Sequence, residues 1–252
     1  MEKLYHIGMD DSHGAKIALL PGDPERVEAI ARHLSHPRFY ARHREYTTWL
    51  GELPCGQTAM VMSTGMGGPS TAIGVEELYQ TGVRDFIRVG TCGGMAMDVV
   101  GGDVVIATGA IRMEGTTREY VPIEFPAVAH LDVSNALIRA AREQGFRYHA
   151  GIVQCKDSFY GQHDPERMPS GGDLMNKWRA WIKAGCLASE MESAALFIVC
   201  QILGARSGCV LSVVWNQERR DAGLSNPECH DPERAIEVAV RAAEILARGD
   251  EP

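Results

Sequence analysis

The chain lacks the features of a membrane or secreted protein. None of its apolar runs approaches the roughly 20 residues that a membrane-spanning helix needs. Its first six residues, MEKLYH, lack the charged start and apolar stretch of a signal peptide. Its seven cysteines are odd in number and contain no CxxC pair, which disfavours a disulfide framework and indicates reduced thiols. We therefore expect a cytoplasmic protein.

Excess positive charge and metal-ligand spacing are also absent. Lys and Arg number 25 against 33 Asp and Glu, and the net charge of -8 argues against a nucleic-acid-binding surface. The nine histidines show no HExxH or similar spacing, so a catalytic transition metal is not expected. No linker or repeat divides the sequence. We expect one domain over residues 1–252.

Apolar runs of strand length alternate with helical patterns along the chain. Strands are expected near 17–20, 58–64, 86–89, 103–108, 150–156 and 208–214, and helices near 24–34, 70–78, 134–144, 174–184, 190–203 and 231–248. This alternation predicts an α/β fold, a three-layer α/β/α domain with a mixed, largely parallel central sheet. Ligands in such folds bind at the carboxyl ends of strands, so motifs that follow strands are expected on one rim.

The segment PGDPERV, residues 21–27, follows the first apolar run and opens a helix. Backbone N–H groups at such a turn bind anions, and Arg26 adds a formal charge one turn into the helix. Arg88 lies inside a strand between apolar neighbours, where a charge is costly unless it is paired. Either a salt bridge, with Asp85 or a distant glutamate, or a bound anion would explain it. The hydroxyl of Thr91 just beyond favours the anion.

A second segment, SEMES at residues 189–193, places two carboxylates beside a methionine at the start of a helix. Carboxylates accept hydrogen bonds, and vicinal sugar hydroxyls donate them. An anion site together with a sugar site indicates chemistry between phosphate and a nucleoside.

Six segments occur in the order found in the nucleoside phosphorylase-I family, which the chain resembles over nearly its whole length. They are HIG (6–8), PGDPERV (21–27), HREYTT (43–48), STGMGGPS (63–70), RVGT (88–91) and EMES (190–193). The chain is most similar to the members of the family that cleave uridine. The resemblance implies a pentosyltransferase that converts uridine and phosphate to uracil and ribose 1-phosphate through an oxocarbenium-like transition state. Phosphate is the co-substrate, no cofactor is required, and deoxyuridine and thymidine stay open as substrates.

The resemblance also assigns residues to three parts of the site. Phosphate is expected on Gly22, Arg26, Arg44, Arg88 and Thr91, ribose on His6, Met191 and Glu192, and the base on Cys92, Gly93, Phe159, Gln162, Arg167, Val214 and Trp215. The expected catalytic residues are Arg88, Gln162, Arg167 and Glu192.

The base end departs from the family pattern at Cys92, Trp215 and Gln217, and in the spacing of Arg167. The amide of Gln162 offers the donor and acceptor that match the uracil edge. In the family an arginine follows this glutamine after one residue, whereas four residues separate Gln162 from Arg167 here. Either the loop bulges and delivers Arg167 to the base, or Arg167 is a surface residue.

His6 and Arg44 would, by the same resemblance, reach the site of a neighbouring subunit. This implies a homo-oligomer with shared sites, a dimer as the minimal active unit and a hexamer built from dimers. Glu45, Met66 and Ser70 match positions that can bind a monovalent cation, potassium, between subunits. A plain interface salt bridge by Glu45 is the alternative.

Three other functions compete with this interpretation: a purine nucleoside phosphorylase, a nucleosidase, and a nucleoside-binding protein without activity. Purine enzymes of the family use an aspartate where this chain has VVWNQ, residues 213–217, with none. Hydrolysis would not need the phosphate arginines. A binding protein would bind uridine without turning it over.

Overall fold

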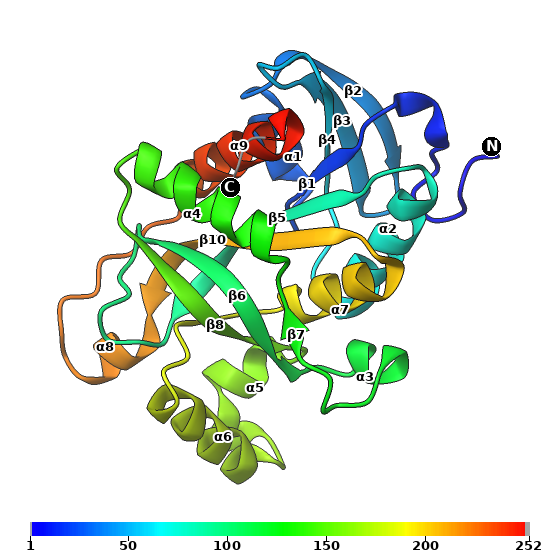
Figure 1. Ribbon diagram of the computed structural model, residues 1–252. Coiled ribbons are helices and arrows are strands. Elements are labelled where there is room, and N and C mark those ends of the chain that lie inside the picture. Colours follow the sequence, from blue (N-terminus) through cyan, green and yellow to red (C-terminus); the bar gives the residue numbers. More distant parts are fainter. Residues whose placement is uncertain (1, 250–252) are drawn as a thin grey trace.

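The structure, a computed structural model, describes residues 2–249, and a single mixed sheet of ten strands runs through them (Figure 1). The strands are β1 (Ile17–Leu20), β2 (Ser35–His43), β3 (Tyr46–Glu52), β4 (Thr58–Met62), β5 (Asp85–Gly94), β6 (Val104–Met113), β7 (Ala127–Val128), β8 (Tyr148–Lys156), β9 (Ala188–Glu190) and β10 (Arg206–Asn216). The α-helices are α1 (Glu25–Ala31), α2 (Gly68–Gln80), α3 (Thr116–Tyr120), α4 (Leu131–Glu143), α5 (Phe159–His163), α6 (Gly171–Lys183), α7 (Ser193–Leu203), α8 (Gln217–Asp221) and α9 (Glu233–Arg248), and two 3-10 turns cover Asp11–His13 and Pro165–Arg167.

The sheet has an open part and a closed part. Its order is β10-β6-β8-β9-β5-β1-β4-β3-β2, with β7 on β6. Because β10 also pairs with β5, the strands from β10 through β5 close on themselves, while β1 to β2 extend outward. The central pairings β4–β1, β1–β5 and β5–β10 are parallel, and the β2–β3–β4 edge is antiparallel. The carboxyl ends of β1, β5 and β10 therefore meet on one side.

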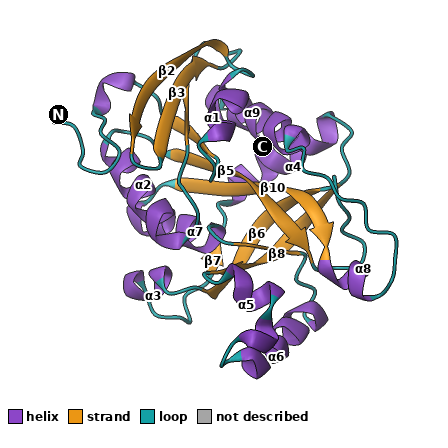
Figure 2. Ribbon diagram, turned by 180° about the vertical axis from the view of Figure 1, so that it is seen from behind, coloured by secondary structure: helices purple, strands orange, loops and turns teal. Residues whose placement is uncertain are grey.

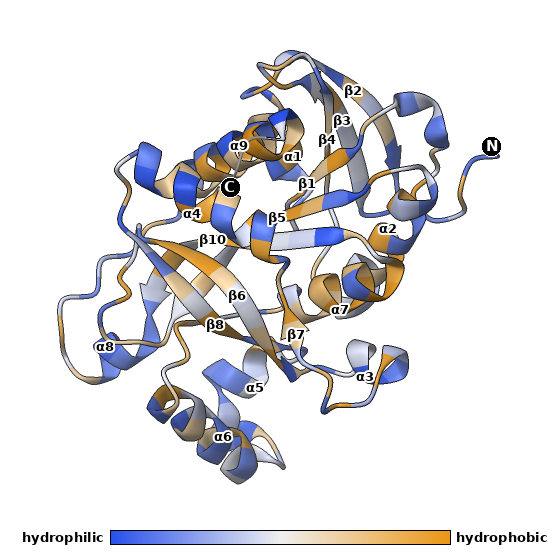
Figure 3. Ribbon diagram, viewed as in Figure 1, coloured by the Kyte–Doolittle hydropathy of each residue, from blue (hydrophilic) through white to orange (hydrophobic). Residues whose placement is uncertain are grey.

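Helices cover both faces of the sheet. Helices α1, α4 and α9 pack on one face over a buried cluster that includes Leu19, Ile87 and Val210 (Figures 1 and 2). Helices α2 and α7 lie on the opposite face over a second cluster that includes Leu20, Phe86 and Leu211. Figure 3 shows the corresponding hydrophobic colouring along the central strands. These alternating residues place one apolar surface on each face, as the two-residue repeat of a strand requires. The three-layer α/β prediction is confirmed.

Two local differences from the predicted elements have clear causes. The β2–β3 hairpin was not predicted, because the side chains of β2 are mostly exposed and polar and give no apolar run. The helix expected from residue 190 begins at Ser193, and the short strand β9 precedes it. Among residues 2–249, none of the helices combines the length and the apolar character needed to cross a bilayer.

Helix α4 approaches β10 closely because Gly208 has no side chain. A Cβ at Gly208 would lie 2.4 Å from the Cγ1 of Val133 and 3.1 Å from the Cδ1 of Leu137. Both neighbours are fully buried helix residues, so neither can move away freely.

We expect Gly208→Ala to lower the free energy of unfolding by about 1–3 kcal/mol, because the added methyl overpacks this contact. Urea denaturation measures the change. Gly172→Ala is the matched control, since a Cβ there meets nothing within 4 Å. Equal stability of the two variants would show that α4 can shift to accept the methyl group.

Candidate functional site

A cavity of about 650 Å³ opens where the carboxyl ends of β1, β5 and β10 meet. Twelve of the residues expected at the site line it. They are Gly22, Arg26, Arg88, Thr91, Met191, Glu192, Cys92, Gly93, Phe159, Gln162, Val214 and Trp215. The motifs that follow the strands thus gather on one rim, as expected for this kind of fold.

Arg88 is a buried residue that lines this cavity, and it pairs with two carboxylates. It points from β5, and its Nε donates to Glu190 Oε2 at 3.0 Å. Its Nη2 pairs with Glu192 Oε2. Burial opposes its charged form, but Glu192 and Glu190 together raise the pKa of Arg88 above its usual range. The salt bridge considered from the sequence is therefore present, with distant glutamates rather than Asp85, which pairs with Arg206.

One edge of the Arg88 guanidinium remains turned toward the glycine turn. A Cβ at Gly22 would lie 4.0 Å from Arg88 Nη1 and 3.2 Å from the carbonyl oxygen of Gly65. Glycine at this position therefore keeps the space beside Nη1 open for a ligand, as close approach to a backbone requires. A salt bridge and a bound anion are therefore compatible at Arg88. Its Nε and Nη2 pair with the carboxylates, while its Nη1 faces the open space.

Arg26 supplies a second cation at the same turn. Its Nη1 is buried and has no hydrogen-bond partner among residues 2–249. Burial lowers the pKa of Arg26, and the charge of Arg88 lowers it further. A buried, unpaired donor is costly, so this guanidinium is arranged for a group that is not part of the chain. Two adjacent cations with free donors favour an anion.

Glu190 and Glu192 are two residues apart in the sequence but have different hydrogen-bond partners. The side chain of Glu190 is fully buried, and it accepts from the backbone N–H groups of Glu192 and Ser193 at 2.9 and 3.0 Å. It therefore builds the turn between β9 and α7. Glu192 accepts from the N–H of Gly67 at 2.6 Å and lines the cavity with Met191. A carboxylate has about four acceptor positions, so Glu192 can still accept from sugar hydroxyls.

The far end of the cavity holds a chain of polar side chains centred on Ser189. The ammonium of Lys156, at the end of β8, donates to Ser189 Oγ at 2.6 Å. The Oγ atom lies 2.6 Å from Gln154 Oε1 and 2.8 Å from Gln162 Oε1. The Nε2 of Gln162 donates to Gln217 Oε1 at 3.2 Å. The residue expected to bind the base is thus held by neighbours on both ends of its amide.

Aromatic rings form the wall beside this polar chain. His163 lies 4.3 Å from Phe159 and 6.0 Å from Trp215, measured between ring centroids. Burial lowers the pKa of His163, and the charges of Lys156 and Arg220 lower it further. The neutral ring and its neighbours suit the faces of a flat heterocycle.

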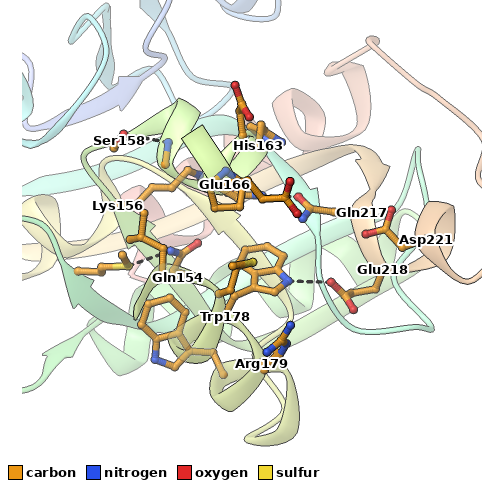
Figure 4. A pocket seen from close by; sticks show the side chains of 18 of the residues that line it. Gln154, Lys156, Ser158, His163, Glu166, Trp178, Arg179, Gln217, Glu218 and Asp221 are labelled. Atoms are coloured by element: carbon orange, nitrogen blue, oxygen red, sulfur yellow. Dashed lines mark hydrogen bonds between the residues drawn. The ribbon is translucent and has the colours of Figure 1, made fainter. Parts of the chain in front are cut away.

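A second cavity of about 570 Å³ adjoins the polar chain and shares Lys156, Gln162 and His163 with the first (Figure 4). Figure 4 shows Trp178 of α6 facing Glu218 of α8, whose Oε1 accepts from the indole Nε1 at 2.7 Å. Arg26 and Arg88 do not line this second cavity. Through the three shared residues, it extends the first cavity on the side of Gln162.

Three expected site residues do not line the cavity of their own chain. Arg167 is 61% exposed and pairs with Asp164 at 2.9 Å. His6 and Arg44 lie together on another surface, where Arg44 is stacked over the ring of Tyr5, 5.5 Å away, and Tyr5 contacts His6 edge-on at 4.9 Å. This geometry favours the surface reading of Arg167, and the roles of His6 and Arg44 stay predictions.

The expected cation-binding residues gather around Gly65. A Cβ at Gly65 would lie 3.1 Å from Glu45 Cγ and 3.3 Å from Ser70 Oγ, while Met66 follows directly and is largely exposed. Within residues 2–249, no cluster of three or more His, Cys, Asp or Glu side chains could hold a metal ion.

Lys156 and His163 were missed from the sequence. The signal for Lys156 was available, since a charge ends an apolar strand there just as Arg88 interrupts one. Its partner Ser189 is 33 positions away, so the contact itself was not readable. His163 carried no signal beyond lying next to Gln162.

The comparisons with known proteins agree with this geometry. A family model described as phosphorylase superfamily matches residues 16–248. A uridine phosphorylase of Treponema pallidum is 54% identical over 248 residues, covering 98% of this chain and 96% of the relative. A uridine phosphorylase of Escherichia coli is 38% identical over 251 residues, 96% and 98% of the two chains. A guanosine phosphorylase of Halorubrum lacusprofundi is 35% identical over 253 residues, covering 98% and 100%.

We expect inorganic phosphate to stabilise the protein through Arg26. At about 100 times its Kd, phosphate should stabilise the folded state by roughly 2.7 kcal/mol and raise the Tm by roughly 5 °C or more. Arg26→Ala should lose most of this rise in a thermal-shift titration. Arg32→Ala, which removes an exposed arginine paired with Glu28, is the control and should keep it. An undiminished rise in Arg26→Ala would mean that phosphate binds elsewhere.

Proposed function

Because the chain belongs to the phosphorylase superfamily, we propose that it is a uridine phosphorylase, which converts uridine and inorganic phosphate reversibly to uracil and ribose 1-phosphate. The observation that carries this proposal is the unpartnered Nη1 of Arg26 beside Arg88, in one cavity with Glu192 and a wall of aromatic and amide side chains. Two arginines, a carboxylate and an amide beside aromatic rings thus line one cavity, which supports the binding of phosphate, ribose and uracil together. The named relatives from T. pallidum and E. coli support uridine as the nucleoside.

The reaction begins with lengthening of the glycosidic bond, so positive charge develops on the ribose ring. Phosphate held by the Gly22 turn, Arg26, Arg88 Nη1 and Thr91 stabilises that charge and then attacks C1′. Glu192 and Met191 orient the ribose. Negative charge moves onto the uracil, and a donor fixed at that position lowers the barrier because it needs no reorganisation.

The cation for the departing base is Lys156 in this proposal, and Arg167 does not take that role. Lys156 is buried at the base end of the cavity, whereas the guanidinium of Arg167 is exposed and paired with Asp164. Burial lowers the pKa of Lys156, and the charge of Glu190 partly offsets this effect. An ammonium in so dry a place gains more from a base anion than an exposed guanidinium would. Gln162 contributes its amide to the base edge once it leaves Gln217.

We also propose that the active unit is a dimer whose sites are shared, within a hexamer, in the cytoplasm. The cavity of one chain is lined by neither His6 nor Arg44, and these two residues share one surface. Glu45 and Ser70 lie beside Gly65, Met66 follows it, and these residues would hold the monovalent cation, potassium. The carboxylate of Glu45 and the hydroxyl of Ser70 are oxygen ligands that suit such an ion.

The function is tested by uracil release from uridine with and without phosphate, beside an inosine control. We expect release that requires phosphate and no cleavage of inosine. Release without phosphate would indicate a nucleosidase, turnover of inosine a purine enzyme, and binding without release a nucleoside-binding protein. Each of these results would overturn the proposal.

The role of Lys156 is tested by two variants. We expect Lys156→Met to lower kcat by about two to three powers of ten, the usual cost of removing one donor to a developing anion. Arg167→Ala should keep kcat within about threefold, because its exposed pair with Asp164 has little energy to lose. The opposite ranking would return the base contact to Arg167.

The pH profile provides a second check on the same residue. Because the pKa of Lys156 is lowered, the ammonium is lost as pH rises through a value below that of an ordinary lysine. We therefore expect kcat to fall on the alkaline side of the profile. A profile that stays flat up to the ordinary lysine range would contradict a catalytic ammonium at this position.

A further inference from the structure

Glu77 is a buried carboxylate of α2 whose partners all belong to the N-terminal turn. Its Oε2 accepts from the backbone N–H groups of His6 and Ile7 at 3.0 and 2.9 Å. Its Oε1 lies 2.6 Å from His6 Nδ1. Since an ionised carboxylate only accepts hydrogen bonds, Nδ1 carries the proton in this contact. Glu77 therefore sets both the position and the tautomer of the His6 ring.

A second element holds the same turn from the other side. His43, at the end of β2, has its Nδ1 2.7 Å from the carbonyl oxygen of His6. Gly8 closes the turn with a φ of +67°, and a Cβ there would lie 3.1 Å from His43 Cβ. Figure 1 shows the N-terminal segment beside α2 and the hairpin strands. Several contacts from α2 and β2 thus fix the half-exposed imidazole of His6.

The Nε2 atom of His6 has no partner among residues 2–249, and His6 does not line the cavity of its own chain. It is grouped instead with Tyr5 and Arg44. A ring held so firmly, with one nitrogen left free, is arranged for a contact outside its own chain. Fixing the proton on Nδ1 makes Nε2 the acceptor in that contact.

We propose that Glu77 is a positioning residue, which orients His6 so that its Nε2 accepts the hydrogen bond of the nucleoside 5′-hydroxyl in the cavity of a second copy. This inference rests on the proposed function and adds the residue that prepares the contact. Glu77 never touches the substrate. Its effect is confined to substrates that carry a 5′-hydroxyl.

The test compares uridine with 5′-deoxyuridine, which lacks that hydroxyl. In the wild-type protein, kcat/KM for uridine should exceed that for 5′-deoxyuridine by roughly fivefold to tenfold, the usual value of one hydrogen bond. Glu77→Ala should lose most of this preference, because kcat/KM should fall for uridine and stay unchanged for 5′-deoxyuridine. His6→Ala should lose it too, and the double variant should be no worse than His6→Ala, because Glu77 acts through His6.

Glu76→Ala is the matched control, since it removes the adjacent carboxylate of α2, whose neighbour is Tyr120 and not His6. It should keep the preference for uridine. If Glu77→Ala does not fold, Glu77→Gln replaces it. Its amide oxygen can still accept from the backbone N–H groups, and the same selective loss is expected.

An equal fall for both substrates in the Glu77 variants would overturn the inference, because it would show a structural role alone. So would a wild-type protein that does not distinguish the two substrates, or a double variant clearly worse than His6→Ala. Absence of any phosphate-dependent cleavage of uridine is a different result, since it would overturn the proposed function itself.

Discussion

The pairing of Arg88 with Glu190 and Glu192 is the interaction on which the rest of the site depends. A guanidinium inside a central strand would be severely destabilising without partners, and its two carboxylates come from a turn about 100 residues later in the chain. Glu190 in turn fixes that turn by accepting from the backbone of Glu192 and Ser193. One buried cation therefore joins β5, β9 and the start of α7, and it leaves a free edge at the Gly22 turn. The atoms of Arg88 that hold the fold together thus differ from the atom that is proposed to bind phosphate.

The proposed base end is held together by hydrogen bonds rather than by ion pairs. No short motif defines it, and its polar groups are joined through a single hydroxyl, that of Ser189. Lys156 and Gln162 lie on either side of this hydroxyl, so any movement of one changes the donors available to the other. The adjoining second cavity leaves room for such movement. In the proposed site, selectivity for the base would depend on a network of exchangeable hydrogen bonds, whereas phosphate binding would depend on fixed charges.

This contrast explains how much the sequence revealed. The strand, glycine turn and helix around Gly22 and Arg26 are contiguous, so local rules predicted the fold there and placed both residues at the cavity. The alternation of strands and helices predicted the three layers. The hairpin of β2 and β3 escaped because exposed polar strands lack an apolar pattern. Lys156 escaped because its burial beside Ser189 cannot be read from the chain. Arg167 was expected from the resemblance, and its exposed position could not be predicted because spacing along a chain says little about where a loop points.

The charges around Arg88 support the proposal that the site is shared between two chains. Two arginines face two buried carboxylates at the phosphate end, so this end carries no net positive charge. A phosphate dianion placed there alone would meet Glu190 and Glu192 at short range, and in a dry site such repulsion is strong. A further cation from outside the cavity would reduce this repulsion. Arg44 is held at a tight turn with a φ of 54° and does not line the cavity of its own chain. The charge balance therefore supports the proposal that a second copy presents Arg44 to this site.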